Sequence, residues 1–541
     1  MSHLRRACAL VAAATLSLTG VNLLGSPAQA ASTDPRPVAI GAGWLADQLT
    51  NGLIHNDQYG FDDIGLSLDA GLSLQEVGGH GVTVAAIASA VGPKVTTGYA
   101  QGDEGGSTGY YAGATAKSLV FAQATGQDLA TWAGTDLVAA LQARVLASGP
   151  STGRIADDSV YGDYANVIGQ AFAARGLSTA SSTSAGSVTT FLLEQQCADG
   201  YFRLEFTADK SATDQTCDGG VAGGNSAPDT DATAMAVLQL EAISSPSAPV
   251  TAAIAKAEAW LLGSQHGDGS FGGGASTEAA NENSTGLAGW ALGVLGDDAA
   301  SAKAATWIRA HQADEPAACA DALSTETGAL GYDDNAVAAG RTDGITTLTQ
   351  DQWRRATAQT LPALRWAPAA PAPLALTGPT GFVKSGSTVT YQVSGVAPGT
   401  RACVSGIGSP RGIVAPASGS FPVAITMPEG TGDHLVAVSL RSGSSASLQA
   451  RVLGSRTLRV RTARYAVHRG GRVYVVVRGV RPGERVWLRF RGVTVRSGVA
   501  GPSGRFVRSI RVGHRLGKAR VVAWGEFPAI RRGHTVVRVV R

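Results

Sequence analysis

Two aspartates at the start of one apolar segment are the residues best placed for acid chemistry. Asp229 and Asp231 stand two residues apart, directly before a run of small and apolar residues that ends near Ala242. A carboxylic acid held neutral in an apolar cavity can act as a general acid. The same residue in the first turn of a helix can instead accept free backbone N–H groups. Other segments of this kind also begin at an acid or an amide, so we expect Asp231 to cap a helix.

Further acids offer carboxylate pairs of the kind that cleave glycosidic bonds. They are Asp62, Asp63, Asp163, Glu282, Asp333 and Asp334. Acids at loop tips are mostly solvated surface groups. Sugar cleavage in an (α/α) barrel is therefore an alternative, not the main expectation.

The cysteines predict a disulfide and argue against a metal site. Cys197 and Cys217 flank a loop of about 19 residues, which a disulfide can close. Cys319 and Cys403 either form a second bridge or remain two free buried thiols. No Cys-x-x-Cys pair occurs, and no histidine stands at ligand spacing from a cysteine, so we expect no zinc site.

Residues 1–30 have the pattern of a signal peptide. Arg5 and Arg6 form a basic start, an apolar stretch follows, and Ala28-Gln29-Ala30 is a small-x-small cleavage site. No later run of eighteen or more apolar residues is free of charge, so no membrane span is expected. The predicted location is outside the cell, either free or associated with the cell wall.

The formal net charge of +3 conceals two parts of opposite charge. From Arg451 to the end there are 23 basic residues against two acids, a net of +21. Residues 1–450 hold 21 bases against 39 acids, a net of −18. Lys518 is the one lysine in the basic part, and arginine's planar fork suits phosphate and carboxylate groups.

We expect this basic part to bind an anionic cell-wall polymer or surface glycan. A solvated face and docking on the chain's own acidic part are the alternatives. Nucleic acid is not an expected partner, because the chain is predicted to be exported and shows no recognition helix.

With 541 residues, 70 of them glycine and only 16% charged, the chain is long enough for several folded domains. Residues 31–366 are expected to form helices in pairs. One kind of segment carries an aromatic residue or Leu before Gln, as in Trp260 to Gln265 and Trp307 to Gln312. The other kind is almost wholly small and apolar. Helices that are apolar all round are buried, so we expect an inner ring inside an outer ring.

The loops between the two kinds of segment carry a repeated motif. Gln196 and Gln265 are each followed, after three residues, by a glycine, and an aromatic residue stands two positions after that glycine. With these loops, residues 39–366 resemble the α-α toroid of terpenoid cyclases and protein prenyltransferase β subunits, which cobalamin carriers share. Asp229-Thr-Asp231-Ala232-Thr-Ala is similar to the Asp-x-Asp-Asp-Thr-Ala motif of class II triterpene cyclases, with Ala232 in place of the third aspartate.

Two functions follow from this resemblance. The first is non-catalytic binding of a small apolar or cofactor-like molecule, for which a cobalamin-like ligand is one candidate and no cofactor is firmly implied. Its ligand-binding residues would be Trp290, Tyr332, Phe271 and Glu282. The second is a terpenoid-cyclase-like enzyme in which Asp231 is the general acid and Asp229 its partner.

After a Pro/Ala linker at residues 367–373 the pattern changes to short alternating strands. The stretch from Ser385-Gly-Ser387 to Gly399 recurs later in the chain as Arg469-Gly-Gly471 to Gly483. Two tandem modules, at residues 374–454 and 455–541, resemble bacterial immunoglobulin-like β-sandwiches. The predicted fold is therefore an all-α toroid followed by two all-β sandwiches.

Overall fold

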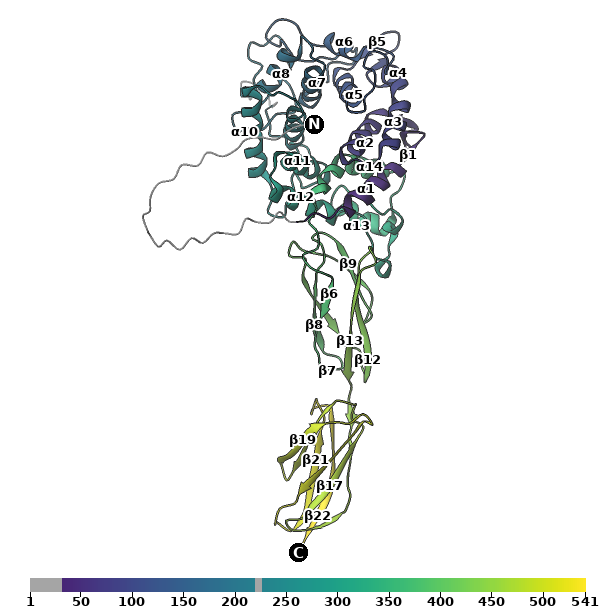
Figure 1. Cartoon of the computed structure of the whole chain (residues 1–541), viewed down its shortest axis with the longest axis vertical. Coiled ribbons are helices and arrows are strands. Elements are labelled where there is room, and N and C mark those ends of the chain that lie inside the picture. Colours follow the sequence, from purple (N-terminus) through teal and green to yellow (C-terminus); the bar gives the residue numbers. More distant parts are fainter. Residues whose placement is uncertain (1–31, 219–225) are drawn as a thin grey trace, which may run out of the picture.

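A computed structural model describes residues 32–218 and 226–541 (Figure 1). The expected signal peptide lies outside these residues. A helical domain runs from α1 (Arg36–Asp47) to the 3₁₀-helix η5 (Leu361–Trp366), and a β-rich region follows from β6 (Ala375–Thr377) to β22 (Arg531–Val540). The predicted order, a helical part before a β part, is confirmed. Within the described residues, no helix has the length and apolar character needed to cross a membrane.

Six helices form the inner layer of the helical domain, and successive ones are in contact (Figure 1). They are α2 (Ile64–Val77), α5 (Ala112–Ala124), α7 (Val167–Thr179), α9 (Thr230–Glu241), α11 (Glu282–Leu295) and α14 (Gln350–Thr360). Helix α14 also contacts α2, which closes the circuit. Small residues allow the close approach: a Cβ on Gly286 of α11 would lie 2.5 Å from the Oγ1 atom of Thr360 on α14.

A second set of helices lies outside this circuit. It comprises α1, α3 (Gly81–Val91), α6 (Leu137–Gln142), α8 (Ala185–Glu194), α10 (Ala248–Ser264) and α12 (Asp298–Ala310). Helix α10 buries one stripe of its surface, made by Val250, Ala253, Ile254, Ala257 and Leu261. This spacing is that of a helix with one face on the core and the other in solvent. Short elements complete the domain: α4 (Val95–Gly98), α13 (Asp334–Asp343), β1 (Leu49–Thr50), β2 (Leu53–Asn56), β3 (Phe61–Asp63), β4 (Gln101–Asp103) and β5 (Thr108–Tyr110).

The glutamines of the repeated motif tie neighbouring helical pairs together. The Gln196 amide donates to the carbonyl of Gly200 and to that of Ala253 on α10, both at 2.8 Å. Gln265 does the same with Gly269 and with Ala300 on α12, at 3.1 and 2.9 Å. Both glycines have positive φ, which explains why the motif requires glycine.

The structure corrects the assignment of the helix cap at α9. The Oδ1 atom of Asp229 accepts the N–H of Ala232 at 2.8 Å, so Asp229 is the cap and Asp231 stands in the first turn. A capping side chain accepts the N–H group three residues ahead, which is free only at the start of a helix. Asp231 already lies inside the first turn, where the N–H three residues ahead bonds to the helix backbone. Asn166 caps α7 in the same way, by accepting the N–H of Gly169.

Both pairs of cysteines are disulfide-bonded. The predicted bridge between Cys197 and Cys217 is confirmed, with Cα atoms 4.9 Å apart. Cys319 and Cys403, for which two states were open, also form a bridge, with Cα atoms 5.7 Å apart. This second disulfide joins the helical domain to the β-rich region.

The β-rich region consists of two modules with one topology. The first module has a sheet in the order β10-β9-β12-β13-β7 and a smaller sheet in the order β11-β8-β6. Its further strands are β7 (Phe382–Lys384), β8 (Thr388–Ser394), β9 (Arg401–Ser405), β10 (Arg411–Val414), β11 (Phe421–Thr426), β12 (Gly432–Ser439) and β13 (Ser445–Leu453). Valines and aromatic residues from both sheets share one core, so the two sheets pack face to face.

The last module repeats this arrangement. Its larger sheet contains β19, β18, β21 and β22, with β14 and β16 paired to β22, and its smaller sheet has the order β15-β17-β20. The strands are β14 (Arg456–Thr457), β15 (Arg459–Thr462), β16 (Ala466–His468), β17 (Arg472–Arg478), β18 (Arg485–Phe490), β19 (Val493–Val499), β20 (Arg505–Arg511) and β21 (Gly517–Trp524). A separate hydrophobic core lies between its sheets.

Candidate functional site

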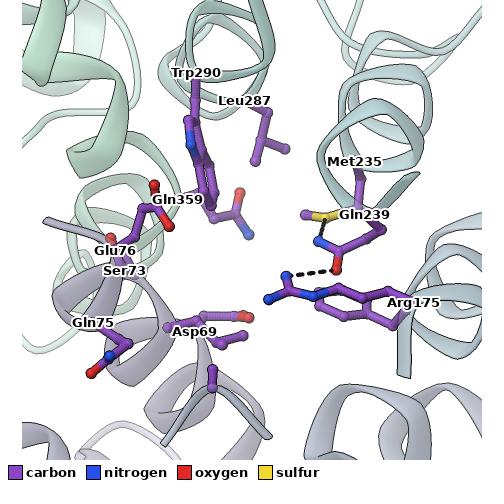
Figure 2. Close-up of a pocket in the computed structure, with 14 residues that line it drawn as sticks. Asp69, Ser73, Gln75, Glu76, Arg175, Met235, Gln239, Leu287, Trp290 and Gln359 are labelled. Atoms are coloured by element: carbon purple, nitrogen blue, oxygen red, sulfur yellow. Dashed lines mark hydrogen bonds between the residues drawn. The ribbon is translucent and has the colours of Figure 1, made fainter. Parts of the chain in front are cut away.

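A pocket of about 100 Å³ lies at the centre of the inner helices, and all six of them contribute to its lining (Figure 2). Phe172, Met235, Leu287 and Trp290 form most of its apolar wall. Figure 2 shows Asp69, Arg175, Gln239 and Gln359 pointing into the same space from four different helices. A concave, largely apolar site with a few converging polar groups is the usual form of a small-molecule site.

The two acids that line this pocket form ion pairs with cations, whereas its arginine forms none with a carboxylate of the described residues. Asp69 is paired with Lys117 at 2.8 Å, and Glu76 with Arg365 at 2.7 Å. The Arg175 guanidinium donates to the neutral amide oxygen of Gln239 at 3.2 Å, and no carboxylate among the described residues is its ion-pair partner. Burial lowers the pKa of Arg175, with Glu76 opposing, but a guanidinium stays protonated.

Two further polar atoms of the lining have no hydrogen-bond partner within the described part of the chain. They are the Oγ atom of Ser73 and the Nε1 atom of Trp290, both buried. The indole N–H can only donate, and the hydroxyl can donate or accept. Together with Arg175, whose described acceptor is one neutral amide oxygen, they give the pocket several groups that can donate to a ligand.

A second cavity, of about 240 Å³, adjoins the first. Tyr99, Tyr111, Tyr164 and Lys117 line it, and Phe172 lines both cavities. The Asp69–Lys117 ion pair also spans them, since Asp69 lines the first and Lys117 the second. The burial of Tyr99 raises the pKa of its hydroxyl, so this tyrosine stays neutral.

The two aspartates of the acid motif lie in an environment that favours their neutral forms. Burial raises the pKa of Asp231 to about 6, with Asp229 adding to the shift and Ser284 opposing it. The Oδ1 atom of Asp231 is buried and has no hydrogen-bond partner in the described residues. Burial also raises the pKa of Asp229, although its bonds to the backbone of α9 oppose this. Asp231 therefore has one property of a general acid.

Glu282 and His311 form a second buried group of ionisable residues. Glu282 has no exposed surface, and burial raises its pKa well above the usual value. Its Oε2 atom lies 3.8 Å from Nδ1 of His311, which in turn lies 2.9 Å from the Trp307 carbonyl oxygen. Burial lowers the pKa of His311, opposed by the Trp307 carbonyl and by Asp334. A neutral Glu282 beside a neutral His311 is the arrangement that burial favours.

Of the four predicted ligand-binding residues, Trp290 alone lines the central pocket. Phe271 has no exposed surface and packs within the main core, outside the lining of the central pocket. Glu282 is equally buried and also lies outside this lining. The backbone oxygen of Tyr332 accepts the N–H of Glu282, and Tyr332 is not part of the pocket lining.

Sequence reasoning missed Arg175 and Ser73. Arg175 stands alone among small and apolar residues in α7, and a single charge inside an otherwise apolar helix is a signal that could have found it. Ser73 gives no comparable signal, because serine is common on every kind of helix surface.

The acids considered for sugar cleavage have local partners. Asp63 caps α2 and pairs with Arg355, and Asp333 caps α13. Asp163 pairs with both Arg154 and Lys210. In residues 32–218 and 226–541, no group of three or more His, Cys, Asp or Glu residues is arranged to hold a metal ion.

Comparison with known proteins gives no family. No family model matches the chain, and no curated protein sequence matches it. Among solved structures, a protein from Actinoplanes has 18% identity and a TM-score of 0.41 over 61% of this chain and 98% of that chain. The type II terpene cyclase MstE from Scytonema has 16% identity and a TM-score of 0.40 over 61% of this chain and 97% of that chain. At these identities and TM-scores the likenesses carry no weight in assigning a function to this chain.

Proposed function

We propose that the helical domain binds a small organic anion in its central pocket. The observation that supports this best is the charge arrangement: Asp69 and Glu76 each form an ion pair with another residue, while no described carboxylate lies within ion-pair distance of Arg175. A carboxylate at this point would meet the arginine fork and come within the donor-rich part of the lining. The apolar part of the ligand would pack against Trp290 and its neighbours.

We also propose an assignment for each part of the fold. The closed circuit of inner helices is an α-α toroid, and the two β modules are immunoglobulin-like sandwiches. The central pocket of the helical domain is small compared with sites for drug-sized ligands, which measure about 300–1,000 Å³. A pocket of about 100 Å³ favours a ligand much smaller than a corrin, so we do not propose a cobalamin-like ligand.

Binding of carboxylates by the whole chain tests this proposal. Calorimetric titration with benzoate and hexanoate, beside benzamide and hexanol, should show that only the acids bind. Replacement of Arg175 by Met should weaken binding by about tenfold to a hundredfold, the range for losing a hydrogen bond to a charged group. Lys256→Gln removes one positive charge from the exposed surface of α10 and should leave binding unchanged. Equal binding of acids and neutral compounds would contradict the proposal.

The second candidate is an acid-catalysed cyclase that uses Asp231. The buried, unpartnered Oδ1 atom and the pKa of about 6 favour it, and the small central pocket argues against a polyprene substrate. Incubation with squalene and a shorter polyprene, followed by mass spectrometry of the products, tests it. A cyclic product from the wild type and none from Asp231→Asn would replace the binding proposal with an enzymatic one.

The last β module completes the proposed function as the part that attaches the chain to an anionic surface outside the cell. The two disulfides are typical of an oxidising compartment. Of the basic residues of this module, Arg481 and Arg531 have carboxylate partners within the described chain, at Asp433 and Glu484. The remaining positive charges are available to an external polyanion.

A further inference from the structure

The two β modules correspond strand by strand. Strands β6, β7, β8 and β9 precede β15, β16, β17 and β18 by one constant offset, since they start at Ala375, Phe382, Thr388 and Arg401 against Arg459, Ala466, Arg472 and Arg485. The offset between β12 and its equivalent β21 is one residue longer. Pairing agrees as well, since Thr388 lies opposite Thr426 in one small sheet and Arg472 opposite Arg511 in the other. The outward positions of the two small sheets therefore have known equivalents.

The outer face of the small sheet in the last module carries arginines in register across its strands. Arg459 of β15 lies opposite Arg478 of β17, which lies opposite Arg505 of β20. At the other end of β17, Arg472 lies opposite Arg511. All five side chains are exposed. Neighbouring strands are about 4.8 Å apart, and the two rows are roughly 20 Å apart along β17.

Such rows carry an energetic cost within the module. Like charges directly opposite on neighbouring strands destabilise a sheet. The two acids of this part are used elsewhere: Glu484 is buried against Arg531, and Glu526 accepts the backbone N–H of Arg485. None of these five arginines has a carboxylate partner among the described residues, so the fold does not neutralise them.

The first module shows that the fold does not need these arginines. At the equivalent positions it has Ala375, Ser394 and Ser420 in one row and Thr388 and Thr426 in the other. These residues are small and uncharged, and the sheet has the same strand order. The arginines of the last module are thus an addition to a fold that forms without them.

Between the two rows the face contains an aromatic residue. Tyr474 is 61% exposed, and its equivalent in the first module is Thr390. Val507, diagonal to it on β20, is 39% exposed. A flat aromatic ring suits the apolar face of a sugar ring, and arginine forks suit the carboxylates or sulfates that such a sugar carries. A single acidic sugar would not reach both rows.

We propose that this face, Arg459, Arg472, Arg478, Arg505, Arg511 and Tyr474, binds a chain of acidic polysaccharide. The polymer would place its acidic groups on the two arginine rows and one sugar ring on Tyr474. This inference rests on the proposed attachment of the last module to an anionic surface, and it names the partner and the face. It is independent of the ligand in the central pocket.

The test exchanges the face for that of the first module in the full-length protein. The exchange variant carries Arg459→Ala, Arg472→Thr, Arg478→Ser, Arg505→Ser and Arg511→Thr. The charge-matched control removes five positive charges from the outer face of the larger sheet by replacing Arg485, Lys518, Arg520, Arg532 and Arg538 with Gln. Binding to polygalacturonate and heparin is measured at physiological salt, with dextran as the neutral polymer and circular dichroism to verify folding.

The exchange should weaken binding to the acidic polysaccharides by about tenfold or more, because five arginine contacts are lost. The control should weaken it by less than about threefold, as expected for a general loss of charge. Tyr474→Thr should weaken polygalacturonate binding but leave binding to polyphosphate unchanged. Equal effects of exchange and control, no effect of Tyr474→Thr, or tighter binding of DNA or anionic vesicles would each overturn the inference. Absence of binding to every polyanion would instead show that the proposed attachment itself is wrong.

Discussion

The two β modules have one topology but use equivalent outward positions in opposite ways. In the first module, Arg401 pairs with Glu315 of the helical domain, and Cys403 is disulfide-bonded to Cys319. Their equivalents in the last module are Arg485, which is exposed, and Trp487, which is half-buried and outside the module's core. Figure 1 shows β9 at the helical domain and the last module at the far end of the molecule.

This difference shows that the fold of a module does not decide what its outward residues do. Alternation along β9 and β18 decides which side chains face outward. Ala402 and Val404 face the core of the first module, as Val486 and Leu488 face that of the last. Whether an outward residue holds the chain together or meets the surroundings depends on what lies against it in three dimensions.

The largest expected effect concerns the buried ion pair that the last module alone has. Glu484 and Arg531 have no exposed surface and form two hydrogen bonds of 2.7 Å, whereas the first module has Thr400 at the position of Glu484. Glu484→Gln should destabilise the last module by about 3–5 kcal/mol, because a buried guanidinium loses its counter-charge. Urea unfolding followed by tryptophan fluorescence of Trp487 and Trp524 measures it. Glu526→Gln is the control and should change stability by less than about 1 kcal/mol.

The next effect concerns the disulfide that fastens the first module. Cys403→Ser should destabilise the contact between the helical domain and the first module by about 2–4 kcal/mol, because the bridge closes a long loop. Calorimetry should show the first module melting earlier, with the last module unaffected. A melting profile identical to that of the wild type would mean that the packed interface holds without the bridge.

A paired substitution compares the equivalent arginines directly. Arg401→Ala removes one of two cations from Glu315, whose side chain is fully buried, and leaves it with Arg341 at 3.1 Å. We expect a loss of about 1–3 kcal/mol. Arg485→Ala, at the exposed equivalent, should change stability by less than about 0.5 kcal/mol. Equal losses in denaturant unfolding would show that the helical domain does not decide the role of this position.

The smallest effect comes from transferring one arginine pair to the first module. Thr388→Arg with Thr426→Arg reproduces the opposed pair Arg472 and Arg511. The double variant should lose about 0.2–1 kcal/mol more than the sum of the single variants, because the charges lie directly opposite. Added salt should reduce this excess. A loss that salt does not change would point to strand propensity instead of repulsion.

Local and periodic features of the sequence determined much of this protein. The change from long apolar segments to short alternating strands predicted a helical part followed by a β part. The spacing of Cys197 and Cys217 predicted their bridge, since a short loop brings its ends together in most folds. The recurrence of one module's pattern in the next depends on turn residues and alternation, and the starts of β6 to β9 and of β15 to β18 follow one offset. These signals need only neighbouring residues, so they can be read without the fold.

Tertiary structure decided the features that depend on distant residues. Cys319 and Cys403 stand far apart in the chain and in different parts of the fold, so only docking of the two parts shows that they meet. Phe271 and Glu282 look like accessible polar or aromatic residues near loops, but the surrounding helices bury them completely. Arg175 is significant because the acids around the pocket pair with other cations, and those partners come from α5 and η5. Ion pairing and burial are settled by what packs against a residue, and one residue's place in the chain does not contain that information.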